Sequence, residues 1–202
     1  MKKGLLYIHG RGGAAEEAAH YRALFPDHDV VGLDYRAQTP WDAREEFRGF
    51  YDRFRAGHGR VTVVANSIGA YFAMAALGRE AIEKACFISP IVDMERLIAD
   101  MMRRSGVSER ELRQRGTVAT ASGETLSWDY LAWTREHPIE WEVPTAVLYG
   151  ARDELQPADA IRSFAARTGA RVTVMENGEH WFHTPAQMAF LDDWIRSEIP
   201  VS

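Results

Sequence analysis

The sequence predicts a three-layer α/β sandwich, in which a mostly parallel sheet of about six strands lies between two layers of helices. Short apolar runs alternate with longer amphipathic runs from end to end, which is typical of βα units. The short runs are almost continuously hydrophobic, as in strands that are buried on both faces. A chain of 202 residues is long enough to bury such a core, so we expect a single domain over 1–202.

The apolar runs and the three- and four-residue spacing of apolar side chains predict the individual elements. The six expected strands are 4–8, 29–33, 61–65, 85–88, 145–149 and 172–175. The expected helices lie near 14–24, 41–55, 68–79, 157–168 and 185–197. Pro157 and Gly169 mark the start and the end of the fourth of these helices.

The segment 91–143 interrupts this alternation. It has no strand pattern, only helical patterns at 94–104 and 108–114 and then a Trp-rich stretch at 126–141. This is longer than a crossover between parallel strands requires. We therefore expect a small helical lid inserted at about 91–143.

Composition and charge narrow the class of protein. The hydrophobic fraction is 46%, and the net charge of -5 comes from interspersed acids and bases, which gives no indication of a nucleic-acid partner. No apolar stretch approaches the roughly 18 residues that span a bilayer, and the first apolar run is too short for a signal peptide. The single Cys86 cannot form an internal disulfide. We expect a cytoplasmic protein without a membrane partner, and the sequence does not indicate its oligomeric state.

The turn after the third predicted strand has the pattern of a nucleophile elbow. The sequence Ala65-Asn66-Ser67-Ile68-Gly69 follows a strand and opens a helix, which is the context that a G-x-S-x-G motif requires. The two outer positions must be small so that the strand and the helix can approach each other, and Ala65 is a departure from the strict motif. Ser67 is the predicted nucleophile; the alternative is that Asn66 or Ser67 is a simple helix cap.

A glycine-rich turn, His9-Gly10-Arg11-Gly12-Gly13, follows the first predicted strand. In an acyl-transfer site it would supply one oxyanion donor, the N–H of Arg11 or Gly12, and the N–H of Ile68 would supply the other. The alternative is a dinucleotide phosphate loop, but the third glycine of that motif is replaced by Ala15.

An acid and a histidine follow the last two predicted strands, in the order that a Ser-Asp-His triad needs. Asp153 is the favoured carboxylate, and Asp93 is its rival. His180 is the favoured base, and His183 is its rival.

These features together resemble the α/β-hydrolase superfamily, through His9-Gly10, the Ser67 elbow, Gly150-x-x-Asp153 and Gly178-x-His180. The resemblance covers nearly the whole chain and is closest to the small single-domain members. It implies a serine hydrolase, such as a carboxylesterase, that cleaves an ester or related acyl bond of a small molecule through an acyl-enzyme, without cofactor or metal. The side chains expected to line the substrate pocket are His9, Trp128, Trp133, Trp181 and His183.

Two other functions stay open at this point. One is a non-catalytic ligand-binding protein that keeps the hydrolase pocket as a receptor. The other is a different reaction on the same fold, such as that of a peptidase or a carbon–carbon hydrolase.

Overall fold

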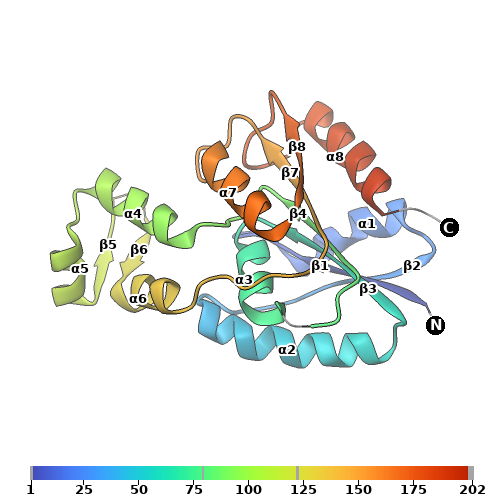
Figure 1. Cartoon of the computed structure of the whole chain (residues 1–202), viewed down its shortest axis with the longest axis horizontal. Coiled ribbons are helices and arrows are strands. Elements are labelled where there is room, and N and C mark those ends of the chain that lie inside the picture. The colour runs from blue at the N-terminus through green and yellow to red at the C-terminus, as the bar shows by residue number, and fades with distance from the viewer. Residues whose placement is uncertain (1, 79, 122, 200–202) are drawn as a thin grey trace. The chain divides into compact units, whose positions relative to one another are not determined.

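The computed structural model describes residues 2–78, 80–121 and 123–199 (Figure 1). The chain divides into two compact units. The first comprises Met1–Val92 and Glu140–Ser202, and the second comprises Asp93–Ile139. Each unit is described by itself below.

A six-stranded sheet forms the centre of the first unit. Its strands are β1 (Lys3–Ile8), β2 (His28–Gly32), β3 (Arg60–Asn66), β4 (Lys84–Ile88), β7 (Thr145–Gly150) and β8 (Arg171–Met175). They are arranged in the order β2-β1-β3-β4-β7-β8, and every neighbouring pair is parallel. All six predicted strands are confirmed. The strand order reverses beside β1, and in such sheets the crevice for ligands opens at the carboxyl ends of the strands next to this point.

Helices cover both faces of this sheet (Figure 1). On one face, α1 (Ala18–Leu24) and α8 (Pro185–Glu198) pack their apolar side chains against Leu5, Val64 and Leu148 of the strands. On the other face, α2 (Pro40–Ala56) and α3 (Ile68–Leu77) lie side by side. The buried side chains of α2 recur every three or four residues, so one stripe of that helix faces the core. The three-layer sandwich is therefore confirmed.

The helix boundaries differ from the predictions in a few places. The expected helix 14–24 begins as the 3-10 turn η1 (Ala15–Glu17) and continues as α1. Helix α7 (Ala158–Thr168) starts one residue later than expected, because Pro157 has extended backbone angles and forms its N-cap. Gly169 ends that helix as predicted, with a φ of 72°. The prediction for 68–79 extended to Arg79, which lies outside the described residues.

The second unit contains more than helices. Helices α4 (Met94–Ser105), α5 (Glu109–Arg115) and α6 (Trp128–Glu136) are accompanied by an antiparallel pair, β5 (Thr117–Ala119) and β6 (Thr125–Ser127). The expectation that 91–143 holds no strand was wrong. Each of these strands has three residues and only one buried side chain, so neither shows a hydrophobic pattern in the sequence.

Within the described parts of the chain, no helix has both the length and the apolar character needed to cross a lipid bilayer.

Candidate active site

Ser67 lies in the turn between β3 and α3, at the carboxyl edge of the sheet. Its φ of 50° and ψ of -122° lie in a region that residues other than glycine rarely adopt. The Ala70 N–H donates to the Ser67 carbonyl at 3.1 Å, and two further backbone hydrogen bonds join Ser67 to β4 and the loop after it. The Ser67 N–H donates to the Ile88 carbonyl at 3.0 Å, and the Ile91 N–H donates to the Ser67 carbonyl at 3.1 Å. A strained turn of this kind lifts the serine hydroxyl above the sheet.

Two glycines provide the space that this turn requires. A Cβ atom at Gly69 would lie 2.3 Å from the His9 carbonyl oxygen, and a Cβ atom at Gly10 would lie 3.2 Å from the Cβ of Ser67. The first distance is shorter than any contact that a real side chain tolerates. The start of α3, the end of β1 and the serine therefore meet at one point.

The Ser67 hydroxyl is hydrogen-bonded to His180, which is hydrogen-bonded in turn to Asp153. Ser67 Oγ lies 2.7 Å from His180 Nε2, and His180 Nδ1 lies 2.7 Å from Asp153 Oδ2. An ionised carboxylate only accepts hydrogen bonds, so in the neutral imidazole Nδ1 carries the proton. His180 Nε2 is then left to accept the proton of the serine hydroxyl.

The Asp153 carboxylate is held in one orientation. Its side chain is 0% exposed, and the oxygen that does not meet His180 accepts hydrogen bonds from the N–H groups of Leu155 at 2.8 Å and Gln156 at 3.1 Å. The loop after β7 therefore supplies its own backbone donors to the carboxylate. This leaves Oδ2 directed at the imidazole.

The acid loop and the histidine loop touch each other through two glycines. A Cβ atom at Gly150 would lie 2.5 Å from the carbonyl oxygens of Gly178 and Glu179, which are backbone atoms and cannot move aside independently. The Arg152 N–H also donates to the Gly178 carbonyl at 2.9 Å. This close approach brings the carboxylate within reach of the imidazole.

The two rival residues make other contacts. Asp93 is the N-cap of α4 in the second unit, where its side chain accepts a hydrogen bond from the Arg96 N–H at 2.9 Å. The His183 ring stacks on Trp181, with centroids 4.4 Å apart, and its Nδ1 lies 2.8 Å from the Trp181 carbonyl. The hydrogen-bonded chain from Ser67 thus contains the favoured acid and base of the sequence prediction.

Of the predicted oxyanion residues, Ile68 directly follows Ser67, and Arg11 and Gly12 belong to the turn that begins at Gly10, which approaches Ser67. Arg11 and Gly12 are the exposed central residues of a turn in which the Gly13 N–H donates to the Gly10 carbonyl at 3.1 Å. Gly12 has a φ of 74°, a conformation that favours glycine. Ile68 is the first residue of α3. The first N–H groups of a helix have no partner within the helix and are directed outward from its N-terminus.

A chain of polar side chains around the buried Tyr7 links the two turns, and the sequence prediction missed it. Asn66 Nδ2 donates to the Tyr7 hydroxyl at 2.9 Å, and that hydroxyl donates to Glu17. The other oxygen of Glu17 accepts the Ala14 N–H at 3.2 Å. Burial raises the pKa of Tyr7, so its hydroxyl keeps its proton and donates to the carboxylate. The residue before Ser67 is thereby joined to the end of the glycine-rich turn.

His9, an expected pocket residue, is buried against Tyr35. The two rings are stacked with centroids 4.2 Å apart, and the Tyr35 hydroxyl donates to the His9 carbonyl at 2.9 Å. Tyr35 follows the second strand and was not singled out in the sequence. Tyr35 is half-buried, and the need of its hydroxyl for a hydrogen-bond partner does not identify that partner in the sequence.

The three expected pocket tryptophans have different surroundings. Trp181 follows His180 directly and is 72% exposed. Trp128 and Trp133 belong to the second unit, where Trp128 lies under the Arg113 guanidinium and Trp133 stacks on His137. Their contribution to a pocket stays a prediction.

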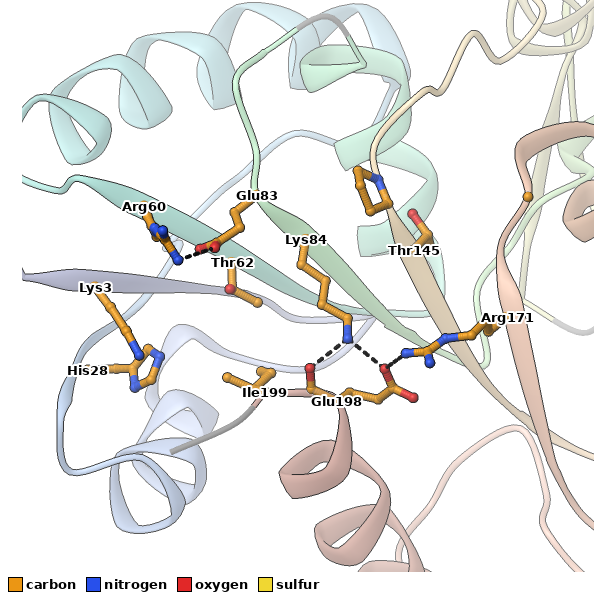
Figure 2. Close-up of a pocket in the computed structure, with 12 residues that line it drawn as sticks. Lys3, His28, Arg60, Thr62, Glu83, Lys84, Thr145, Arg171, Glu198 and Ile199 are labelled. Carbon is orange, nitrogen blue, oxygen red and sulfur yellow. Dashed lines mark hydrogen bonds and ion pairs between the residues drawn. The ribbon is translucent and has the colours of Figure 1, made fainter. Parts of the chain in front are cut away.

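A cavity of about 490 Å³ lies at the amino ends of the strands, opposite the end at which Ser67 lies (Figure 2). It is lined by residues at the start of the strands and at the end of α8, and several of its charged groups bind one another. Lys84 Nζ lies 2.6 Å from the Glu198 carboxylate, which also contacts Arg171, and Arg60 pairs with Glu83 at 3.0 Å. The cavity is remote from Ser67, so we place the candidate active site at the carboxyl edge. No cluster of three or more potential metal-ligating side chains occurs among the described residues.

Comparisons with known proteins agree with this fold. The sequence profile of the alpha/beta hydrolase family matches residues 5–192. Alpha/beta hydrolase domain-containing protein 10 from mouse has a similar structure, with a TM-score of 0.77 and 17% identity over 96% of this chain and 88% of that one. Est1E from Butyrivibrio proteoclasticus gives a TM-score of 0.75 and 14% identity over 98% and 86% of the two chains.

A putative hydrolase from Agrobacterium vitis S4 is also similar, with a TM-score of 0.72 and 16% identity over 98% and 88% of the two chains. A search of curated protein sequences found no match. The match to the family profile spans most of the chain, and the parallel six-stranded sheet agrees with it. The chain belongs to the alpha/beta hydrolase family.

Proposed function

We propose that this protein is a serine hydrolase that cleaves an ester or related acyl bond, with Ser67 as nucleophile, His180 as general base and Asp153 as the carboxylate that orients the histidine. The observation that supports this assignment is the hydrogen-bonded chain from Ser67 Oγ through His180 to Asp153, with 2.7 Å at each step. Membership of a family of hydrolases is consistent with it.

The first half of the reaction forms an acyl-enzyme. The Ser67 oxygen attacks the substrate carbonyl carbon while its proton moves to His180 Nε2. Asp153 stabilises the imidazolium that results, because its carboxylate accepts the Nδ1 proton. The tetrahedral intermediate then collapses: the bond to the alcohol breaks, the alcohol takes the proton from Nε2, and the acyl group stays on Ser67.

The second half releases the acid. His180 removes a proton from water, and the hydroxide oxygen attacks the acyl carbon. The bond to the Ser67 oxygen breaks, the proton on Nε2 returns to that oxygen, and the carboxylic acid leaves. No group is consumed besides water, and the enzyme is restored.

Backbone N–H groups would stabilise the negative charge on the carbonyl oxygen in both halves. We assign these donors to Ile68, at the N-terminus of α3, and to Arg11 or Gly12, in the turn after β1. Preorganised donors of this kind contribute about 10²- to 10³-fold to catalysis. The dipole of α3 favours negative charge at the same place.

The unit Asp93–Ile139 is proposed to select the substrate, in keeping with the lid expected from the sequence. Trp128 and Trp133 of that unit, and His9, Trp181 and His183 of the first, are the proposed pocket residues. A cytoplasmic location and a small-molecule substrate stay predictions of the sequence. Hydrolysis rates for p-nitrophenyl esters of increasing chain length, for the wild type and Trp133→Ala, test the selection: the order of preference changes if Trp133 contacts the acyl group.

The experiment for the proposed function compares two serine variants. Ser67→Ala should lower kcat for ester hydrolysis by at least about 10⁴-fold and keep the melting temperature of the wild type within a few degrees. Ser197→Ala, in which a hydrogen bond to the Trp194 carbonyl near the end of α8 is lost, should hydrolyse at the wild-type rate. Full activity in Ser67→Ala would exclude the proposed reaction.

A further inference from the structure

Gln156 is a fully buried polar side chain in the loop that carries Asp153. It is 0% exposed and lies three residues after the carboxylate, just before helix α7. A buried amide is costly unless both its donor and its acceptor are satisfied. The partners of Gln156 therefore indicate why an amide is present at this position.

Gln156 joins two loops that both contact the proposed triad. Its backbone N–H donates to Asp153 Oδ1 at 3.1 Å, and its carbonyl accepts the Tyr149 hydroxyl at 2.9 Å. Its side-chain oxygen accepts the Val92 N–H at 2.9 Å, and its side-chain amide donates to the Leu155 carbonyl at 3.1 Å. The backbone of Gln156 thus belongs to the acid loop, and its side chain reaches the loop after β4.

The end of β4 and the loop after it are hydrogen-bonded to the backbone of the nucleophile. Ile88, the last residue of β4, and Ile91 make two of the backbone hydrogen bonds of Ser67, and Val92 is the next residue along the chain. Ser89 of this loop has a φ of 43°, and its N–H donates to the Leu148 carbonyl at 2.8 Å. The backbone of this loop is therefore hydrogen-bonded to Ser67, and the side chain of Gln156 joins the same loop to the loop that contains Asp153.

We propose that Gln156 is a positioning residue that sets the distance between the Asp153–His180 pair and Ser67. The proposal rests on the proposed function of that triad. Gln156 does not touch the reacting atoms. It acts by joining the segment that is hydrogen-bonded to Ser67 to the loop that contains Asp153. Loss of this link lets the imidazole and the hydroxyl drift apart, and displacements of about 1 Å can lower a rate by about 100-fold.

The hydrogen bonds also determine which replacement should preserve the link. The Val92 N–H can only donate and the Leu155 carbonyl can only accept, so position 156 needs one acceptor and one donor. A protonated glutamic acid offers both in the same shape. An ionised glutamate has lost the donor, and methionine has a similar length but offers neither a strong acceptor nor a donor.

The experiment measures acylation directly, by the burst of p-nitrophenol released from p-nitrophenyl acetate in stopped flow. Gln156→Met should slow the acylation rate constant by about 10- to 100-fold and leave the apparent binding constant for the ester within a few-fold. Gln156→Glu should approach the wild-type rate as the pH falls, because burial favours the protonated carboxyl. The activity of Gln156→Glu relative to the wild type should then decline as the pH rises.

Tyr51→Phe is the matched control. It removes a partly buried hydrogen bond, 2.9 Å long, from the hydroxyl of Tyr51 on α2 to the Ala81 carbonyl. It should lower the melting temperature without changing acylation.

The outcomes separate the two proposals. If the wild type shows no burst and is not labelled by a fluorophosphonate, the proposed function fails. If the wild type acylates and Gln156→Met acylates as fast as Tyr51→Phe, the role of Gln156 is wrong. Should Gln156→Met fail to fold, Gln156→Glu decides: a ratio to wild-type activity that does not change with pH overturns the proposal.

Discussion

Replacement of Asp153 by asparagine is predicted to abolish most of the activity and to leave the fold nearly unchanged. Asp153 Oδ1 accepts two backbone N–H groups, from Leu155 and Gln156. In Asp153→Asn the amide oxygen must stay on these donors, because the NH₂ group cannot accept from them. The NH₂ group is then directed at His180 Nδ1.

The magnitude follows from this orientation. Turning the amide around would forfeit two hydrogen bonds, each worth about 1 kcal/mol, so the orientation with the oxygen on the backbone is favoured by about 30-fold. The amide then donates to Nδ1, and His180 must carry its proton on Nε2, where it cannot accept the proton of Ser67. With loss of the carboxylate charge as well, we expect kcat to fall about 10⁴-fold, as in a serine protease with the same substitution, or about 5.5 kcal/mol in the barrier.

Steady-state hydrolysis of a p-nitrophenyl ester measures this loss, and denaturant unfolding measures stability. The unfolding free energy should change by less than about 2 kcal/mol, because both backbone hydrogen bonds persist. Asp192→Asn is the matched control, since Asp192 pairs with His20 at 2.7 Å outside the site, and it should keep full kcat. If Asp153→Asn retains more than a tenth of the wild-type kcat, the assigned role of Asp153 is refuted.

Three further predictions concern packing and the buried polar groups. Gly150→Ala should cost about 1–3 kcal/mol of stability in a urea titration and lower kcat at least about tenfold, because its Cβ would lie 2.5 Å from the backbone of the histidine loop. Gly49→Ala is the control: its Cβ on α2 would have one contact, at 3.7 Å, so the protein should become more stable by about 0.5–1 kcal/mol. Tyr7→Phe should lower the unfolding free energy by about 1–3 kcal/mol, since it removes two hydrogen bonds of the Tyr7 hydroxyl, one of them to a carboxylate, and a loss below about 0.5 kcal/mol would contradict the chain of bonds to Asn66 and Glu17. Burial raises the pKa of the Cys86 thiol to about 12, so a thiol reagent at pH 8 should label it only in denaturant. The unfolding free energy should fall as the pH rises from about 9 towards 12, because the thiol then ionises in the unfolded chain before it ionises in the folded protein. Rapid labelling of the native protein would show that the thiol is accessible.

The sequence predicted the sheet well because every strand in it is buried on both faces. Such strands are marked by uninterrupted apolar runs, and the predicted ends at Ile8, Ala65 and Ile88 lie within one residue of the observed ends. The hairpin of β5 and β6 could not be found in the same way. Its strands bury only Val118 and Leu126, and a single apolar residue in three carries no periodicity.

The candidate site, too, was predicted only in part. Ser67, Asp153 and His180 could be proposed because each follows a recognisable strand, and the carboxyl ends of parallel strands meet at one edge. The contacts of Tyr7, Tyr35 and Gln156 depend on which side chains face each other across the core, and a single sequence does not contain that information. Of these contacts, those of Gln156 are the ones that we propose to position the triad.

One measurement tests the central claim most directly: mass spectrometry of the protein after reaction with a fluorophosphonate, followed by peptide mapping. The proposed mechanism predicts one adduct per chain, on the peptide that contains Ser67, and a strongly reduced labelling rate in His180→Ala. Absence of an adduct, or an adduct on a serine other than Ser67, would contradict it.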